Sequence, residues 1–192
     1  YDMLKPIDKE LEIKHIKLIS KSGGKTSFAN EPTYAIKAAV VVCSDSVFTG
    51  KKEDKAGKRV VEKLTQHGIV SEHYSVIPDE PSALQEKIMQ LVTEKYALVL
   101  FCGGTGLSPR DITPDTIQPM LEREIPGMME AARAYGQQRT PYAMLSRGVA
   151  GMIENTLVIT LPGSSKGAIE SMDALFPYVK HIFVVAQGMR HD

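Results

Sequence analysis

Residues 97–116 read ALVLFCGGTGLSPRDITPDT, an apolar run that passes directly into a loop of glycines, hydroxyl groups and charges. A continuous apolar run of this kind is typical of a strand that is covered on both faces of its sheet. Gly103 is the first of three glycines around a threonine, and such a cluster marks a turn. The sequence therefore predicts a buried strand over 97–103 that ends in a polar, glycine-rich loop.

Three other segments have the character of strands, and helical patterns separate them. The strand candidates are AIKAAVVVCS at 35–44, IVSEHYSVIP at 69–78 and TLVITLPG at 156–163. Strands that alternate with helices in this way build βαβ units. The predicted fold class is α/β, a three-layer sandwich with a twisted, mostly parallel sheet.

The helical segments are identified by their apolar spacing and by their end signals. A capping box of Ser82 and Gln85 opens a helix whose Leu84, Ile88 and Leu91 share one face. Other helical patterns occupy the segment that carries Val60, Val61 and Leu64 and stops at Gly68, the segments 114–124 and 127–139, and a long stretch from about 166 to 188.

Composition limits the classes of partner that the chain can serve. Its 192 residues include 23 basic and 23 acidic side chains, so no excess of positive charge favours nucleic acid or an anionic membrane. The apolar runs are far shorter than the roughly 20 residues of a membrane-spanning helix. Cys43 and Cys102 lie inside apolar runs, where free thiols in a reducing compartment fit better than a disulfide. We expect a cytoplasmic protein that acts on small molecules or protein surfaces.

Polar segments follow all four predicted strands. In an open parallel α/β sheet, ligands bind outside the carboxyl ends of the strands, so these loops should meet at one edge. The loops contain Ser44 and Asp45, Asp79, the segment 103–111, and the segment 161–166. The sequence therefore predicts a ligand site at this edge.

The loop Gly103-Gly104-Thr105-Gly106 can form an anion-binding nest, because glycine lets consecutive N–H groups turn outward. It is neither a Walker A sequence nor the dinucleotide fingerprint G-x-G-x-x-G, so both commoner nucleotide folds are disfavoured. A plain turn is the alternative for these four residues alone. The charges of the following RDITPDT favour a ligand site, since a plain turn needs no charges.

The loop after the fourth predicted strand offers a second nest. It places Ser164, Ser165 and Lys166 at the start of a predicted helix, directly after Pro162 and Gly163. The N-terminus of a helix attracts phosphate. The alternative is an ordinary N-cap by one of the two serines.

Asp45, Asp79 and Asp111 are the carboxylates nearest to three different strand ends. Carboxylates beside phosphate nests hold Mg²⁺ or position a nucleophile, although each aspartate alone could be a helix cap or a turn residue. Together with two nests, they favour metal-assisted phosphoryl or nucleotidyl transfer. The five histidines are scattered, so zinc is not indicated. No base partner is evident for Ser44, Ser46 or Ser146, so a hydrolase triad has little support.

These motifs, in this order, resemble the MogA/MoaB family of molybdopterin adenylyltransferases, which is related to the G domain of gephyrin-type proteins. The resemblance covers residues 36–188 and rests on CSDSVFTGKKEDKAG, VIPDE, CGGTGLSPRDITPDT, REIPGMMEAAR, AMLSRGVAG and LPGSSKGA. It implies a fold that assembles as a trimer or a hexamer. It also implies that ATP donates AMP to the terminal phosphate of molybdopterin, with Mg²⁺ and release of pyrophosphate.

The resemblance also implies roles for individual residues. Asp79 and Asp111 match the catalytic aspartates of the family and are expected to hold Mg²⁺. The other matched positions are expected to bind molybdopterin and the nucleotide, and they are Ser44, Asp45, Gly103, Gly104, Thr105, Gly106, Asp115, Ser146, Arg147, Pro162, Gly163, Ser164, Ser165 and Lys166. The alternative to an enzyme is a non-catalytic module that binds pterin or nucleotide. A third reading is a scaffold that assembles the domains fused to it, which does not exclude catalysis.

The first 25 residues resemble a different family. YDMLK with KSGGK is similar to the end of cyclic pyranopterin monophosphate synthase, the MoaC family, whose residues matching Asp2, Lys5 and Lys25 serve catalysis or lie near the pterin phosphate. An i, i+3 ion pair is the alternative for the first two. We therefore expect the tail of a truncated synthase domain at 1–25, a linker at 26–34 and a MogA/MoaB-like domain at 35–192, without cyclisation activity.

Overall fold

The computed structural model describes residues 7–8, 10, 12, 36–176 and 178–186. Contacts divide the chain into two units, Tyr1–Thr33 and Tyr34–Asp192. The predicted synthase-tail residues Asp2, Lys5 and Lys25 lie outside the described residues. The predicted domain boundaries at 25 and 34 therefore stay a prediction.

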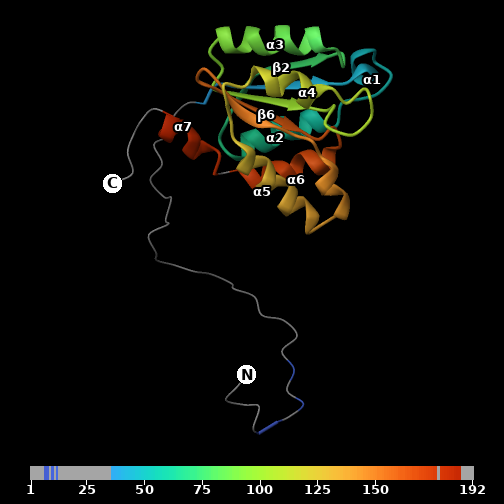
Figure 1. Cartoon of the computed structure of the whole chain (residues 1–192), viewed down its shortest axis with the longest axis vertical. Helices are drawn as coiled ribbons and strands as arrows, with labels where there is room; N and C mark the ends of the chain where they lie inside the picture. Colours follow the sequence, from blue (N-terminus) through green and yellow to red (C-terminus); the bar gives the residue numbers. More distant parts are fainter. Residues whose placement is uncertain (1–6, 9, 11, 13–35, 177, 187–192) are drawn as a thin grey trace. The chain divides into compact units, whose positions relative to one another are not determined.

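A six-stranded sheet forms the centre of the second unit, with the strand order β2-β1-β3-β6-β5-β4. Strands β2, β1, β3 and β6 are parallel, whereas β5 is antiparallel to both of its neighbours. Helices lie on both sides of the sheet (Figure 1), so the predicted α/β sandwich is confirmed. The strands are β1 Ala38–Cys43, β2 Ser71–Ile77, β3 Leu98–Cys102, β4 Arg123–Glu124, β5 Ala150–Ile153 and β6 Thr156–Leu161.

The central strands are covered on both faces, as their apolar sequences require. Every residue of β1, β3 and β6 is buried. Alternate side chains point to opposite faces, so Val40 belongs to one core cluster and Val41 to the other. Cys43 and Cys102 are buried free thiols, as predicted.

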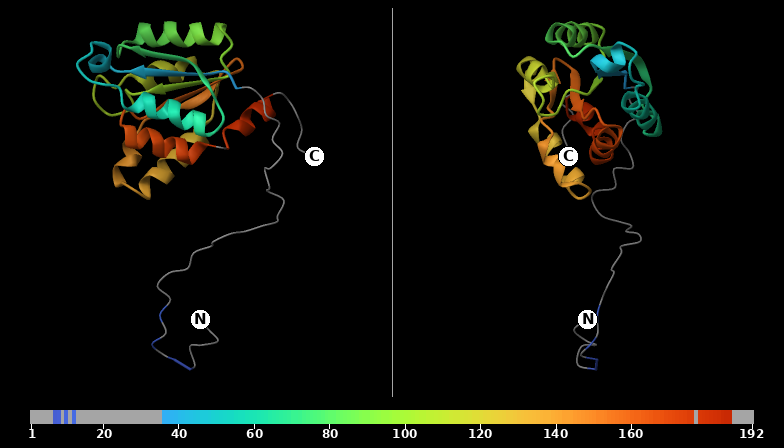
Figure 2. Two further views of the ribbon diagram at one scale, coloured as in Figure 1. Left: turned by 180° about the vertical axis from the view of Figure 1, so that it is seen from behind. Right: turned by 90° about the vertical axis from the view of Figure 1, so that its right-hand side faces the viewer.

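Helices α3 and α4 cover one face of the sheet, and α2, α5 and α6 cover the other (Figures 1 and 2). Leu84, Ile88 and Leu91 of α3 are fully buried, which confirms the predicted apolar face. None of the helices among the described residues is long and apolar enough to cross a membrane. The helices are α1 Asp45–Phe48, α2 Ala56–Gln66, α3 Pro81–Thr93, α4 Thr113–Ile117, α5 Pro126–Gln137, α6 Ser165–Leu175 and α7 Lys180–Ala186, with the 3-10 segments η1 Gln118–Met120 and η2 Pro141–Leu145.

The predicted capping box of Ser82 and Gln85 is wrong. Helix α3 begins at Pro81, with Glu80 as its N-cap and no side-chain cap. Proline has a φ that suits the first helical turn and lacks the N–H group that a cap would satisfy. Ser82 therefore lies inside the first turn of the helix.

Two predicted helices are too long. The segment 114–124 contains α4 from its second residue to its end, followed by η1 and by strand β4. The long stretch from 166 is divided, because α6 ends at Leu175, Phe176 adopts extended backbone angles, and α7 begins at Lys180. Strands β4 and β5 were not predicted, since runs of two and four residues are too short for a pattern of alternation.

Candidate active site at the carboxyl edge of the sheet

The loops at the carboxyl ends of the parallel strands surround two adjoining pockets. The first, here called the carboxylate pocket, has a volume of about 360 Å³ and is bordered by Asp79, Asp111 and the start of the glycine loop. The second, here called the α5–α6 pocket, has a volume of about 250 Å³ and is lined by α5, α6 and η2. Ser164, directly before α6, borders both. The loops therefore meet at one edge of the sheet, as predicted.

Asp45 and Asp79 hold the first two strand ends together. The N–H of Asp45 donates to Oδ2 of Asp79 over 3.0 Å, and the N–H of Asp79 donates to Oδ1 of Asp45 over 3.0 Å. Arg110 forms an ion pair with the other oxygen of Asp45. Ser44 caps α1 by accepting the N–H of Val47 over 3.5 Å. The carboxylate of Asp45 therefore has its partners within the protein, and its predicted contact with substrate stays a prediction.

One oxygen of Asp79 lacks a partner. Its Oδ1 atom is buried and forms no hydrogen bond within the described part of the chain. Burial, and then the nearby charge of Asp111, raise the pKa of Asp79 above its usual value. A buried, unpaired carboxylate oxygen costs free energy that a bound cation or hydrogen-bond donor offsets. This oxygen is therefore a candidate ligand contact.

Asp111 borders the same pocket from the end of the glycine loop. Its Oδ2 atom accepts the N–H of Ser108 over 2.9 Å, which fixes the orientation of the carboxylate. Among residues 36–176 and 178–186, no group of three or more His, Cys, Asp or Glu side chains could hold a metal. Mg²⁺, however, commonly binds one or two carboxylates together with substrate phosphates. Asp79 and Asp111 therefore fit a Mg²⁺ ion that is shared with a phosphate ligand.

The glycine loop is only partly an anion cradle. The N–H of Gly103 donates to the carbonyl oxygen of Leu161 over 3.0 Å, so its predicted place in the nest is wrong. The hydrogen bonding between β3 and β6 extends to Gly103, so its N–H group is not available to an anion. No acceptor within the described residues receives the N–H groups of Gly104, Thr105 or Gly106. Of these three residues, Gly104 borders the carboxylate pocket, so its N–H group is a candidate donor for an anion.

Arg147 braces the glycine loop. Its Nε atom donates to the carbonyl oxygen of Gly106 over 2.8 Å, and its backbone N–H donates to the carbonyl oxygen of Thr105 over 3.0 Å. Its guanidinium group also donates to the carbonyl oxygen of Asp111, and to both carboxylate oxygens of Asp115 over 2.8 Å. These contacts use the donors of Arg147 and the carboxylate of Asp115 within the protein. Their predicted contact with substrate stays a prediction.

Replacing Arg147 with Gln should lower the free energy of unfolding by about 1–3 kcal/mol, because two backbone carbonyl groups would lose charged donors. Urea denaturation measures this change. Arg59→Gln is the matched control, since Arg59 is exposed on α2, and it should change the free energy by less than about 0.5 kcal/mol. Equal effects of the two substitutions would contradict the bracing role.

Three cations border the carboxylate pocket without having been predicted as site residues: Lys52, Lys55 and Arg110. Arg110 belongs to the charged segment after the glycine loop, so the sequence did contain a signal for it. Lys52 and Lys55 precede helix α2 and do not follow a strand. The rule that places ligands at strand ends therefore gives no signal for these two lysines.

Cys43 and Cys102 also border the carboxylate pocket, but neither is suited to act as a nucleophile. Burial raises the pKa of both thiols, and the thiolate is the reactive form. The two side chains belong to core clusters on opposite faces of the sheet, which disfavours a disulfide between them. The chemistry of the pocket therefore rests on its carboxylates, cations and N–H groups.

Ser164 is the N-cap of α6, since its Oγ atom accepts the N–H of Gly167 over 3.2 Å. The alternative of an ordinary N-cap is therefore correct for this hydroxyl group. The N–H groups of Ser165 and Lys166 precede the first hydrogen bond of the helix and are available to an anion. Gly163 and Ser165 border the carboxylate pocket, so the start of α6 lies beside the two aspartates.

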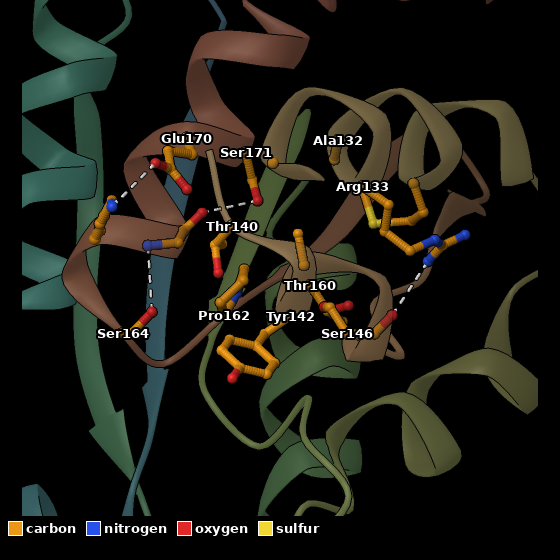
Figure 3. A pocket seen from close by; sticks show the side chains of 15 residues that line it. Ala132, Arg133, Thr140, Tyr142, Ser146, Thr160, Pro162, Ser164, Glu170 and Ser171 are labelled. Atoms are coloured by element: carbon orange, nitrogen blue, oxygen red, sulfur yellow. Dashed lines mark hydrogen bonds and ion pairs between the residues drawn. The ribbon is translucent and has the colours of Figure 1, made fainter. Parts of the chain in front are cut away.

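Four of the predicted binding residues line the α5–α6 pocket: Ser146, Pro162, Ser164 and Lys166. Figure 3 labels the first three of these. Lys166 is not among the residues that border the carboxylate pocket, although the predicted nest places it with the aspartates. Its side chain is 75% exposed and lies 3.9 Å from Glu170, one helical turn further along α6. An i, i+4 pairing on the helix surface therefore directs this lysine toward the second pocket.

Arg133 and Tyr142 also line the α5–α6 pocket and were not predicted (Figure 3). Arg133 donates to the carbonyl oxygen of Ser146 over 3.4 Å, and the ring of Tyr142 is largely exposed. Met129 and Ala132 add buried apolar surface. An aromatic ring and a guanidinium group beside apolar side chains suit a flat, polar ring system.

Similar proteins give these pockets a context. A family model described as "Probable molybdopterin binding domain" matches residues 39–181. A molybdenum cofactor biosynthesis bifunctional protein of Chlorobaculum tepidum is 38% identical over 191 residues, which are 100% of this chain and 60% of the relative. A molybdopterin adenylyltransferase of Helicobacter pylori is 32% identical over 149 residues, which are 76% of this chain and 85% of the relative.

A solved structure is similar in fold as well as in sequence. The molybdopterin biosynthesis enzyme MoaB of Thermus thermophilus has a TM-score of 0.73 and 37% identity, and the match covers 82% of this chain and 99% of that chain. The resemblance to the MogA/MoaB family is therefore confirmed. The chain spans about three fifths of the length of the bifunctional relatives that it matches.

Proposed function

We propose that this chain, which belongs to the family of the "Probable molybdopterin binding domain", acts in molybdenum cofactor biosynthesis by transferring AMP from ATP to the terminal phosphate of molybdopterin. Pyrophosphate is the leaving group of this transfer. Two relatives that are 32% identical bear the name molybdopterin adenylyltransferase, which supports the proposed reaction. The second activity of the bifunctional relatives is not part of the proposal.

The observation that carries the proposal is that two carboxylates and unpaired backbone N–H groups meet in one pocket. Asp79 has a buried oxygen that forms no hydrogen bond with any residue that the structure describes, and the charge of Asp111 acts on this carboxyl group. Gly104 and the start of α6 border the same space. Carboxylates can hold a metal while N–H groups receive phosphate oxygens. Both stabilise the charge that develops during transfer to or from a phosphate.

Adenylyl transfer requires no covalent intermediate on the protein. An oxygen of the pterin phosphate attacks the α-phosphorus of ATP in line, and the bond between the α-phosphorus and the bridging oxygen of pyrophosphate breaks. Asp79 and Asp111 would hold Mg²⁺, which neutralises charge on phosphate oxygens when bound. The N–H groups of Gly104 and Ser165 donate to phosphate oxygens and hold the reacting atoms in line.

The two adjoining pockets suit the two substrates. The α5–α6 pocket has Tyr142 and Arg133 beside apolar side chains, and a flat pterin ring can stack and form hydrogen bonds there. The carboxylate pocket suits the phosphates of ATP. Ser164 borders both pockets, so the terminal phosphate of molybdopterin and the α-phosphate of ATP would meet at the start of α6.

A second candidate function is self-association, in which the chain assembles domains that are fused to it. The side chains of η2 favour it, because Tyr142, Met144 and Leu145 are 73%, 58% and 47% exposed. Burial of apolar side chains against further copies stabilises an oligomer. We propose a trimer or a hexamer, and such an assembly is compatible with adenylyl transfer.

Incubation of the chain with ATP, Mg²⁺ and molybdopterin tests the reaction. Mass spectrometry should detect adenylylated pterin together with an equal amount of pyrophosphate, and a chelator of Mg²⁺ should stop product formation. A chain that binds both substrates but forms no adenylylated pterin is a binding module, and the proposed reaction is then wrong.

Replacing Asp79 with Asn should raise the melting temperature of the ligand-free chain at neutral pH by a few degrees. Because folding raises the pKa of Asp79, the free energy of unfolding falls as the pH rises from the usual carboxyl pKa through the raised one. An amide carries no charge to desolvate, and its oxygen can still accept the N–H of Asp45. The gain should disappear below about pH 4, where the carboxyl group is protonated in both states. A gain that is the same in acid would contradict this explanation.

A further inference from the structure

The segment from Lys52 to Lys55 borders the carboxylate pocket and leads into α2. Helix α2 covers the face of the sheet opposite to α3 and α4, the helices that begin beside Asp79 and Asp111. The pocket therefore has carboxylates from the side of α3 and α4, and a lysine-bearing segment from the side of α2.

The two acids of this segment are satisfied by local partners. Glu53 forms an ion pair with Lys58 over 2.8 Å. Asp54 is buried, and its carboxylate accepts the N–H of Gly57 over 2.9 Å, the N–H of Lys58 over 3.1 Å and the hydroxyl group of Tyr74 over 2.5 Å. These bonds fix the segment against the start of α2. Glu53 is paired with a cation, whereas Asp54 keeps its negative charge, because its three donors are neutral.

Lys52 and Lys55 are the two cationic side chains of this segment. Within residues 36–176 and 178–186, neither ammonium group forms an ion pair or a hydrogen bond. The backbone N–H of Lys52 donates to the carbonyl oxygen of Ser46 over 2.9 Å, so its position beside the pocket is fixed. Two unpaired ammonium groups, three residues apart on a braced segment, can receive an anion with more than one charge.

The start of α6 adds N–H donors to the same pocket. Ser165 borders the pocket as the first residue of α6, and its N–H has no partner within the helix. Helix α6 is packed beside α2, because Lys63 of α2 forms an ion pair with Asp173 of α6 over 2.6 Å. The partial positive charge at the start of α6 therefore acts on the pocket together with the two lysines.

We propose that Lys52 and Lys55 form a subsite for the pyrophosphate group, which holds the β- and γ-phosphates of ATP and then the released pyrophosphate. This inference rests on the proposed adenylyl transfer for its place in the reaction. When the bond from the α-phosphorus to the bridging oxygen breaks, the electron pair and the negative charge pass to pyrophosphate. The lysines stabilise that charge, so they lower the barrier and also retain the product.

Calorimetric titration of the chain with inorganic pyrophosphate alone tests the subsite without pterin. The double variant Lys52→Gln/Lys55→Gln should bind pyrophosphate at least about tenfold more weakly than the unaltered chain. Lys51→Gln is the matched control, because Lys51 is an exposed neighbour that does not border the pocket. The affinity of this variant for pyrophosphate should stay within about twofold of that of the unaltered chain. Circular dichroism melting establishes that both variants are folded.

The outcomes of this titration are independent of the transfer assay. Equal affinities of the double variant and the control would overturn the subsite, as would the absence of pyrophosphate binding by the unaltered chain at millimolar concentration with and without Mg²⁺. If adenylylated pterin never forms but pyrophosphate binding still depends on both lysines, the subsite stands and the proposed function is wrong. In an active chain, the double variant should also be less inhibited by added pyrophosphate.

Discussion

Asp111→Asn is expected to reduce the turnover of adenylyl transfer by about 100-fold to 1,000-fold, with little change in the affinity for ATP. The amide has the same shape, and its oxygen can accept the N–H of Ser108 that now bonds to the carboxylate. The variant therefore keeps the loop in place and loses only the negative charge. A Mg²⁺ ion shared with the substrate phosphates needs that charge. The substitution should therefore lower kcat and leave the affinity for ATP nearly unchanged.

Steady-state kinetics and nucleotide titration together measure this effect. Glu86→Gln is the control for a lost carboxylate, because Glu86 is exposed on α3 and outside both pockets, and its turnover should be unchanged. Loss of ATP binding by Asp111→Asn with normal residual turnover would mean that the residue serves binding and not the chemical step.

Gly103→Ala is expected to lower the free energy of unfolding by about 3–5 kcal/mol. Gly103 has a φ of +119°, a backbone conformation in which a residue with a side chain is strained. A Cβ atom at this position would lie against the carbonyl oxygen of Cys43, far inside contact distance, and a backbone atom cannot turn away as a side chain can. The strand ends of β1 and β3 would have to separate, which would also disturb the pocket.

Gly68→Ala separates the two causes of this loss. Gly68 also has a positive φ of +71°, but an added Cβ atom there meets nothing within 4 Å. The substitution should cost only about 1–2 kcal/mol, which is the contribution of the backbone conformation alone. Chemical denaturation of both variants measures the difference. Similar losses for the two glycines would mean that contact with Cys43 is unimportant.

The position of the site could be predicted because it follows from topology. Asp79 and Asp111 follow parallel strands, and such ends meet at one edge whatever the details of packing. The buried strands were predictable for a similar reason, since β1, β3 and β6 are apolar throughout. A strand that is apolar at every position is typical of one that is covered on both faces of its sheet.

The individual roles of residues depended on contacts that sequence spacing does not contain. Gly103 and Gly104 are adjacent in the same motif, yet the N–H of the first completes the strand pairing, and that of the second has no acceptor in the described part of the chain. Arg147 lies far from Asp115 in the sequence, and only the folded chain brings them together. The lysines before α2 reach the pocket because the buried Asp54 accepts backbone N–H groups at the start of α2 and so fixes their segment. No sequence motif predicts these hydrogen bonds.

A crystal structure of the chain with Mg²⁺ and a non-hydrolysable ATP analogue tests most directly whether one pocket gathers the carboxylates and the phosphate donors for nucleotidyl transfer. The α-phosphate should lie beside Asp79 and Asp111, which would hold Mg²⁺, and the terminal phosphates should be directed toward Lys52 and Lys55. Binding of the nucleotide outside the carboxylate pocket, or with its phosphates directed away from both aspartates, would contradict the proposed mechanism.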